Sequence, residues 1–169
     1  RYIGEMSLDK KEGLGIMTES TGAKYAGQWV NDKLNGVVLI INTNNCFYIG
    51  NANEDQFNGL GYLQLNNNSY YKGNFSFGIK EGFGIMFDSI KKEYYIGDWS
   101  NDLPSGQGEF KYNNGDSYIG NWASGKIQGN GKMSFFNGDA LECEWKGIAT
   151  GNGTLELNDK SIYRDMLPR

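Results

Sequence analysis

Seven glycines recur along the chain at spacings of 22 to 24 residues: Gly13, Gly36, Gly59, Gly82, Gly106, Gly129 and Gly151. Six of them are followed two positions later by a second glycine, and Val38 replaces that glycine in the second repeat. Self-similarity at a fixed short period is typical of a repeat protein, in which each unit contacts only its neighbours. The sequence therefore predicts a solenoid that functions through its surface.

A second column of residues opens each repeat. A Tyr-x-Gly triplet starts at Tyr2, Tyr25, Tyr48, Tyr71, Tyr95 and Tyr118, and Leu141-Glu142-Cys143 replaces it in the seventh repeat. Four residues after each start lies a bulky side chain in every repeat except the third: Met6, Trp29, Phe75, Trp99, Trp122 and Trp145, with Ala52 as the exception. All four tryptophans of the chain fall in this column. The column therefore predicts one aromatic row shared by all repeats.

The alternation of these residues predicts the fold. Tyr, Gly and Trp at alternate positions lie on one face of a strand, because successive side chains point to opposite sides. A second strand with an apolar key residue follows each G-x-G, and turns such as Asn114-Gly115 and Asn137-Gly138 separate the strands. Two strands in about 23 residues leave no room for a helix, except near Tyr163–Leu167. We expect an all-β, elongated, single-layer antiparallel β-meander of about seven hairpins, a twisted ribbon.

The pattern Y-x-G-x-W followed by G-x-G resembles the MORN repeat (membrane occupation and recognition nexus). The resemblance runs from about Tyr2 to near Ile162. It implies a structural role, because MORN proteins commonly scaffold cytoskeletal assemblies such as axonemal spoke heads, basal structures and membrane–cytoskeleton junctions. MORN repeats also occur as accessory modules beside lipid kinases and methyltransferases.

The repeat frame predicts a single solenoid over residues 1–169, with units that start near residues 2, 25, 48, 71, 95, 118 and 141. A degenerate eighth unit starts near residue 163, and the absence of a cap before Tyr2 indicates a segment of a longer chain. No apolar stretch is long enough to cross a bilayer. We expect a cytoplasmic protein associated with the cytoskeleton or a cilium. Cys46 and Cys143 lie about 40 Å apart in this frame, too far for a disulfide.

The glycines and loop residues have predictable conformations. The first glycine of each G-x-G supplies a positive φ, and the strand glycines leave room for an aromatic ring to lie across the sheet. The loop column Asp9, Asp32, Asp55 and Asp102, with Gly78 and Gly125, is expected to adopt left-handed backbone. The fourth repeat carries one extra residue before Tyr95, which predicts a longer, bulged turn around Lys91–Tyr94.

Several kinds of chemistry are disfavoured by the composition. The chain has no histidine, which excludes Ser-His or Cys-His nucleophile pairs and histidine metal sites. The segment Gly120–Lys126 nearly matches a phosphate-binding loop, but Ile127 stands where Ser or Thr must bind magnesium. One loop carboxylate per repeat is too sparse for a calcium site. We therefore expect no enzyme activity, no metal and no cofactor.

The charge pattern disfavours nucleic acid and membrane lipid as ligands. The net charge is −4 and the lysines are scattered, whereas anionic ligands need clustered basic residues. We therefore expect protein partners, in the form of a helix or an extended segment on the aromatic face, and homo-association through edge strands.

A single-layer sheet is expected to leave its aromatic face open, and an open apolar face is typical of a protein-binding site. The candidate partner-binding residues are Tyr71, Phe75, Tyr95, Trp99, Tyr118, Trp122 and Trp145. For most of these rings the favoured interpretation is that they pack on one another as the core of the ribbon, and the rings that no second layer covers are the candidate anchors. We expect a non-catalytic protein-interaction scaffold of a ciliary or axonemal assembly, such as a radial spoke head, or of another cytoskeletal assembly. The alternatives are a phosphoinositide-binding membrane tether and a regulatory segment of a larger enzyme.

Overall fold

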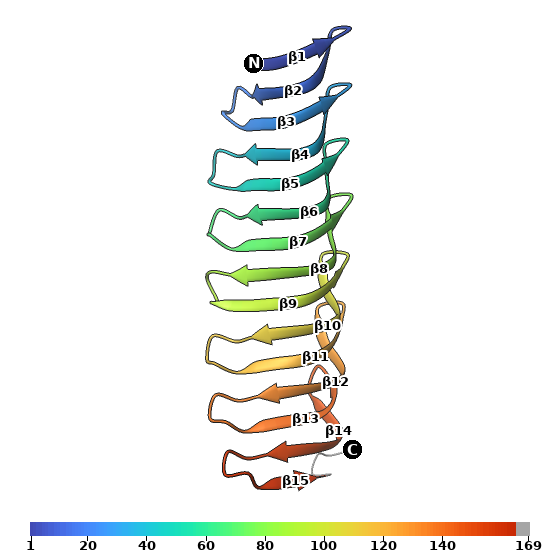
Figure 1. Cartoon of the computed structure of the whole chain (residues 1–169). Helices are drawn as coiled ribbons and strands as arrows, with labels where there is room; N and C mark the ends of the chain where they lie inside the picture. The colour runs from blue at the N-terminus through green and yellow to red at the C-terminus, as the bar shows by residue number, and fades with distance from the viewer. Residues whose placement is uncertain (165–169) are drawn as a thin grey trace. The chain divides into compact units, whose positions relative to one another are not determined.

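The computed structural model describes residues 1–164, which form β-strands joined by short turns (Figure 1). Over these residues there is no helix, as the sequence predicts. The helix allowed near Tyr163–Leu167 is replaced at Ile162–Arg164 by strand β15, and residues 165–167 lie outside the described residues.

The chain divides into two compact units, with the boundary between Gly84 and Ile85 inside strand β8. The first unit contains β1 (Tyr2–Ser7), β2 (Lys10–Thr18), β3 (Lys24–Val30), β4 (Lys33–Ile41), β5 (Phe47–Asn53), β6 (Gln56–Gln64), β7 (Tyr70–Ser76) and the start of β8 (Ile79–Asp88). The second unit contains the end of β8, β9 (Glu93–Ser100), β10 (Leu103–Lys111), β11 (Ser117–Ala123), β12 (Lys126–Ser134), β13 (Ala140–Lys146), β14 (Ala149–Glu156) and β15 (Ile162–Arg164).

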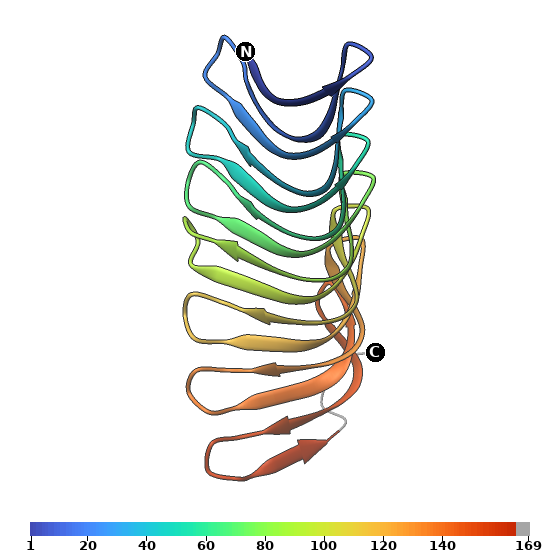
Figure 2. The same ribbon diagram turned by 45° about the horizontal axis from the view of Figure 1, so that its top comes forward.

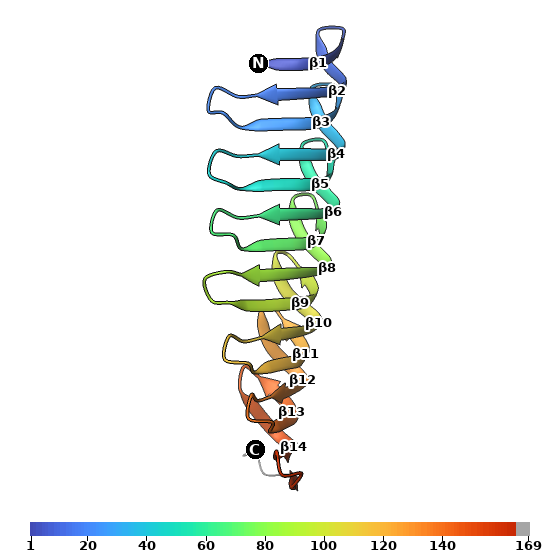
Figure 3. The same cartoon turned by 60° about the vertical axis from the view of Figure 1, so that its left-hand side comes forward.

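Within each unit the strands pair antiparallel in chain order, which makes each unit a β-meander. The register brings opening tyrosines opposite the apolar residue of the second strand, as in Tyr2 with Met17 and Tyr118 with Met133. In neither unit does a second layer cover the described strands (Figure 3). The predicted single-layer antiparallel meander is confirmed.

Two-residue turns close the hairpins within the repeats. In the first six repeats both turn residues have positive φ, as in Asn31 and Asp32 at 49° and 70°. This is the type I′ geometry that matches the twist of paired strands, so the predicted left-handed loop column is confirmed. The turns also join neighbouring repeats, because the Asp32 carboxylate accepts a 2.8 Å hydrogen bond from the Lys11 amide. The Asp55 carboxylate accepts the equivalent 2.7 Å bond from the Leu34 amide.

The first glycine of the G-x-G motif bends the strands. Six of these seven glycines have a φ between 60° and 85°, as predicted: Gly13, Gly36, Gly59, Gly82, Gly106 and Gly129. Gly151, the seventh, belongs to β14. The hairpin register shifts beside these glycines, as between Gly120 and Trp122, and such bulges bend a strand. Figure 2 shows the bent hairpins.

The extra residue of the fourth repeat lengthens the strands instead of the turn. Strand β8 has 10 residues and β9 has 8, and only Ser89–Lys92 separate them. The Tyr94 ring stacks on Phe87 at 4.5 Å between centroids, and the Lys92 amide donates a 2.8 Å hydrogen bond to the Asp88 carbonyl. The predicted longer turn is wrong, because this ring pair favours extending the hairpin before the chain reverses.

Candidate partner-binding surface

One face of the sheet, called the inner face below, carries the tyrosine and tryptophan columns. Apart from Tyr25, the opening tyrosines lie with their rings flat over the glycines of their own repeats: a Cβ added to Gly131 would lie closer than 3.0 Å to the Tyr118 ring, and one added to Gly108 would meet Tyr95 similarly. The tyrosine hydroxyl donates to a backbone carbonyl three residues later, as from Tyr95 to Asp98 at 2.8 Å. The predicted role of the strand glycines, to leave room for a ring, is confirmed.

Trp29, Trp122 and Trp145 each pack on the tyrosine of the preceding repeat. The Trp122 ring meets Tyr95 edge-on at 5.2 Å between centroids, and Trp145 meets Tyr118 at 5.6 Å. The Trp122 indole N–H also donates a 3.2 Å hydrogen bond to the carbonyl of Gly108. Trp29 donates the same bond to Gly15, and Trp145 to Gly131. The aromatic columns are therefore the interface between successive repeats.

The sequence-predicted binding rings are buried, with exposed fractions from 0% for Tyr118 to 9% for Trp122: Tyr71, Phe75, Tyr95, Trp99, Tyr118, Trp122 and Trp145. The rings bury one another on the inner face of the bent hairpins, as Tyr95 and Trp122 do. Trp122 lines a shallow hollow of about 310 Å³ together with Phe110 and Ile127. In this arrangement the rings form the core, and a partner-anchoring role for them stays a prediction.

The second and third repeats depart from this ring packing, and their substitutions compensate for one another. In the second repeat Val38 fills the space of the missing glycine and is 1% exposed. Tyr25 is turned away toward Glu19, which accepts its hydrogen bond. Leu34 and Ala52 complete the core there, being 3% and 6% exposed, so the third repeat needs no large ring at residue 52.

Burial of the tyrosines predicts a loss of stability at alkaline pH. Burial raises the pKa of Tyr48 to about 12 and also raises the pKa of Tyr95 and Tyr118. An unfolded tyrosine ionises near pH 10. Because the folded pKa values lie above the unfolded value, their contribution to stability is complete below about pH 10 and is lost as the pH rises further.

We therefore expect the melting temperature to fall between about pH 10 and pH 12, with tyrosinate absorbance rising together with unfolding. A Tyr48→Phe variant should show a smaller alkaline decline than the unmodified chain. Equal declines in both proteins would contradict the assignment to this buried hydroxyl.

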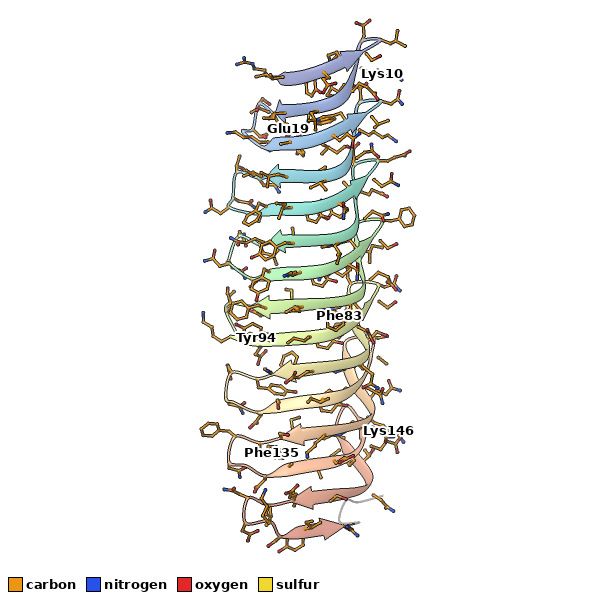
Figure 4. The ribbon with its side chains drawn as sticks, in the orientation of Figure 1. Lys10, Glu19, Phe83, Tyr94, Phe135 and Lys146 are labelled. Carbon is orange, nitrogen blue, oxygen red and sulfur yellow. The ribbon has the colours of Figure 1, made fainter. Side chains whose placement is uncertain are left out.

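The opposite, outer face of the first unit exposes apolar side chains. The middle residue of each G-x-G motif there is large, apolar and 56–69% exposed: Leu14, Val37, Leu60 and Phe83 (Phe83 is labelled in Figure 4). In the second unit the same position is polar, as Gln107, Asn130 and Asn152. The sequence interpretation missed this column because it treated the middle residue as a spacer, although its change from apolar to polar is visible in the repeat frame.

The two cysteines are free thiols, as predicted. Among the described residues no cluster of histidine, cysteine, aspartate and glutamate is arranged to hold a metal ion. No helix in the described part has the length and hydropathy to span a membrane.

The MORN-repeat family model matches five segments that together cover more than half of the chain: residues 2–23, 25–37, 71–89, 95–117 and 118–140. The unmatched stretches include the third repeat, which has Ala52, and the seventh, which has Leu141 and Cys143. No protein with a curated function matches the sequence.

Two solved structures from Drosophila melanogaster share the fold at 11% identity. One is the TCP domain of SAS-4 (dCPAP) in complex with a proline-rich motif of Ana2 (dSTIL), with a TM-score of 0.59 over 98% of this chain and 88% of that chain. The other is the TCP10c domain of Sas-4, with a TM-score of 0.54 over 98% of each chain. At this identity the likeness concerns the fold alone.

Proposed function

We propose that this chain, which belongs to the MORN-repeat family, is a non-catalytic protein-interaction scaffold of a cytoskeletal assembly. The observation that carries the proposal is the exposed apolar column of the first unit, Leu14, Val37, Leu60 and Phe83. Exposed apolar patches of this kind are typical of protein-binding sites. Among assemblies of this class, a ciliary or axonemal structure such as a radial spoke head is the one that the family resemblance favours.

Two further observations support a protein ligand. A domain of the same fold, the TCP domain of SAS-4, was solved in complex with a proline-rich motif of another protein, and proline-rich segments favour the extended polyproline II conformation. The charge of the chain is −4, and ion pairs such as Lys33 with Glu54 at 3.0 Å engage some of the lysines. Both features favour an uncharged, extended protein segment over an anionic lipid headgroup.

The scaffold proposal is tested by affinity capture of the full chain from ciliated cells, followed by mass spectrometry. We expect the recovered proteins to be enriched in cytoskeletal components relative to capture with an unrelated β-protein. In parallel, the chain is sedimented at low salt with vesicles of phosphatidylcholine alone or with added phosphoinositide. Sedimentation that needs phosphoinositide and disappears at high salt would replace the scaffold by the membrane tether.

A further inference from the structure

Two parallel rows of apolar side chains cross the outer face of the first unit. The outer apolar rows are defined here as the G-x-G middle residues Leu14, Val37, Leu60 and Phe83, and the residues two positions after three of them, Ile16, Leu39 and Tyr62. In the first row the exposed fractions are 68%, 69%, 64% and 56%, and Ile16 and Leu39 are 51% and 37% exposed. These side chains lie on β2, β4, β6 and β8, one strand in each repeat.

Amide side chains alternate with the first row. Leu14 pairs across the sheet with Gln28, Val37 with Asn51, and Leu60 with Asn74. Along the direction perpendicular to the strands, the surface therefore presents an apolar side chain and an amide in turn. The apolar side chains can contact apolar groups of a ligand, and the amide N–H groups can donate hydrogen bonds to its backbone carbonyls.

The spacing of this alternation selects the conformation of the ligand. Successive apolar residues of a row are separated by two strand spacings, about 9.5 Å. A polyproline II helix repeats every three residues at 3.1 Å per residue, about 9.3 Å per turn. An α-helix presents side chains on one face every 5.4 Å, or about 10.5 Å over seven residues, and an extended strand does so every 6.6–6.8 Å, so the polyproline II period is the nearest match to the row.

The chemistry of a polyproline II segment matches as well as its period. Its backbone makes no internal hydrogen bonds, so its carbonyls can accept from the amides of the surface. Asn51 and Asn74 each donate one N–H to a carbonyl of the sheet, that of Leu60 at 3.5 Å and that of Phe83 at 3.4 Å, so the second N–H of each amide is the donor for the segment. Every third side chain faces the same side and can lie over one apolar residue of each repeat. Proline-rich sequences adopt this conformation before binding, which lowers the entropic cost of docking on an open surface.

The second unit lacks the same pattern and serves as an internal contrast. Gln107 and Asn130 replace the exposed apolar residues, and Glu109 and Lys132 stand at the positions of Ile16 and Leu39. The inner-face packing is shared by both units, so the core does not require the apolar outer residues of the first unit.

We propose that the outer apolar rows of the first unit bind a proline-rich segment in polyproline II conformation that runs across the strands. This inference rests on the proposed function and names the ligand class and its surface. The distance from the first repeat to the fourth is about 28 Å, which a segment of about nine or ten residues spans. One residue in three contacts the row formed by Leu14, Val37, Leu60 and Phe83.

The probe is a twelve-residue peptide of four Pro-Pro-Leu triplets, titrated into the full chain by isothermal calorimetry. The test variant is Val37→Gln with Leu60→Asn, which copies the residue types of the second unit. We expect at least tenfold weaker binding, equivalent to the loss of two apolar contacts of about 0.7 kcal/mol or more each. The melting temperature should stay unchanged, because both side chains are largely exposed.

Two controls make the result specific. A peptide of four Gly-Ser-Leu triplets keeps the leucines but not the conformation, and it should bind at least tenfold more weakly. The reciprocal variant Gln107→Leu with Asn130→Leu should strengthen binding or add a second site. Equal binding of both peptides, or no effect of the Val37→Gln, Leu60→Asn variant, would overturn the proposal.

The same variant separates the competing occupants. Concentration-dependent dimerisation that the double substitution abolishes, without peptide binding, would assign the rows to a second copy of the chain and overturn the proposal. If the variant still captures every cellular partner of the unmodified chain, the proline-rich site is wrong while the scaffold function stands. Failure of the unmodified chain to capture any protein would contradict the scaffold function itself.

Discussion

Replacing Trp122 by alanine is expected to lower the free energy of unfolding by about 3–5 kcal/mol, the usual cost of deleting a buried aromatic side chain. Trp122 is 9% exposed and contacts Tyr95, Tyr118 and Phe110 with ring centroids 5.2, 5.6 and 5.9 Å away. Its removal also leaves the Gly108 carbonyl without its indole donor. Chemical denaturation followed by tryptophan fluorescence measures the loss.

The matched control is Trp122→Phe, which keeps a ring but not the N–H group and should cost less than the alanine variant. Partner affinity is measured on the same proteins below their melting temperatures. Unchanged affinity with lowered stability identifies Trp122 as core. An affinity loss of about 2 kcal/mol or more with little loss of stability would instead identify the ring as a partner anchor.

Adding a single methyl group at Gly131 is expected to destabilise the chain by about 3 kcal/mol. The new Cβ would overlap the ring of Tyr118, which is 0% exposed and has no free space to enter. Overpacking typically costs 1–3 kcal/mol, and displacement of a buried ring adds to that cost. Thermal or denaturant melting of Gly131→Ala measures the effect.

A double-mutant cycle identifies the cause. In a Tyr118→Leu background the clashing ring is gone, so Gly131→Ala should cost less than about 1 kcal/mol, giving a coupling energy of about 2 kcal/mol. Gly131 has no positive φ, so backbone strain makes no separate contribution. Equal costs of Gly131→Ala in both backgrounds would show that the glycine is needed for another reason.

The fold could be predicted from the sequence because each shared residue has one dominant physical role. Tyr118 with its glycines, the positive φ of Gly129 and the turn at Asp102 follow from local sterics and strand alternation. None of these inferences requires knowledge of distant parts of the chain. Repetition then multiplies a weak local signal into a strong one.

The binding surface could not be predicted in the same way. Some rings, such as Trp99, were expected to stand open as partner anchors on a twisted single-layer sheet, but the bulges beside the G-x-G glycines bend the hairpins, and the rings are buried. The degree of bending depends on many small register shifts, which single residues do not reveal. The exposed apolar side chains lie on the outer face, at positions such as Val37, where the repeat pattern does not specify the type of residue.

Trp29, Trp122 and Trp145 each pack on the preceding repeat, and this dependence limits how such a chain can grow by duplication of repeats. A copied repeat fits its new neighbours only under one condition. The repeat before each junction must hold its tyrosine over its glycines, and the repeat after the junction must supply the large ring that packs on this tyrosine. Copying the third repeat, with Ala52, behind a repeat that keeps its tyrosine in place would leave a ring-sized hole. In the second and third repeats, Val38 and Leu34 fill the core in place of the shared rings. These two repeats are therefore expected to be duplicated or lost together, as one segment of about 46 residues.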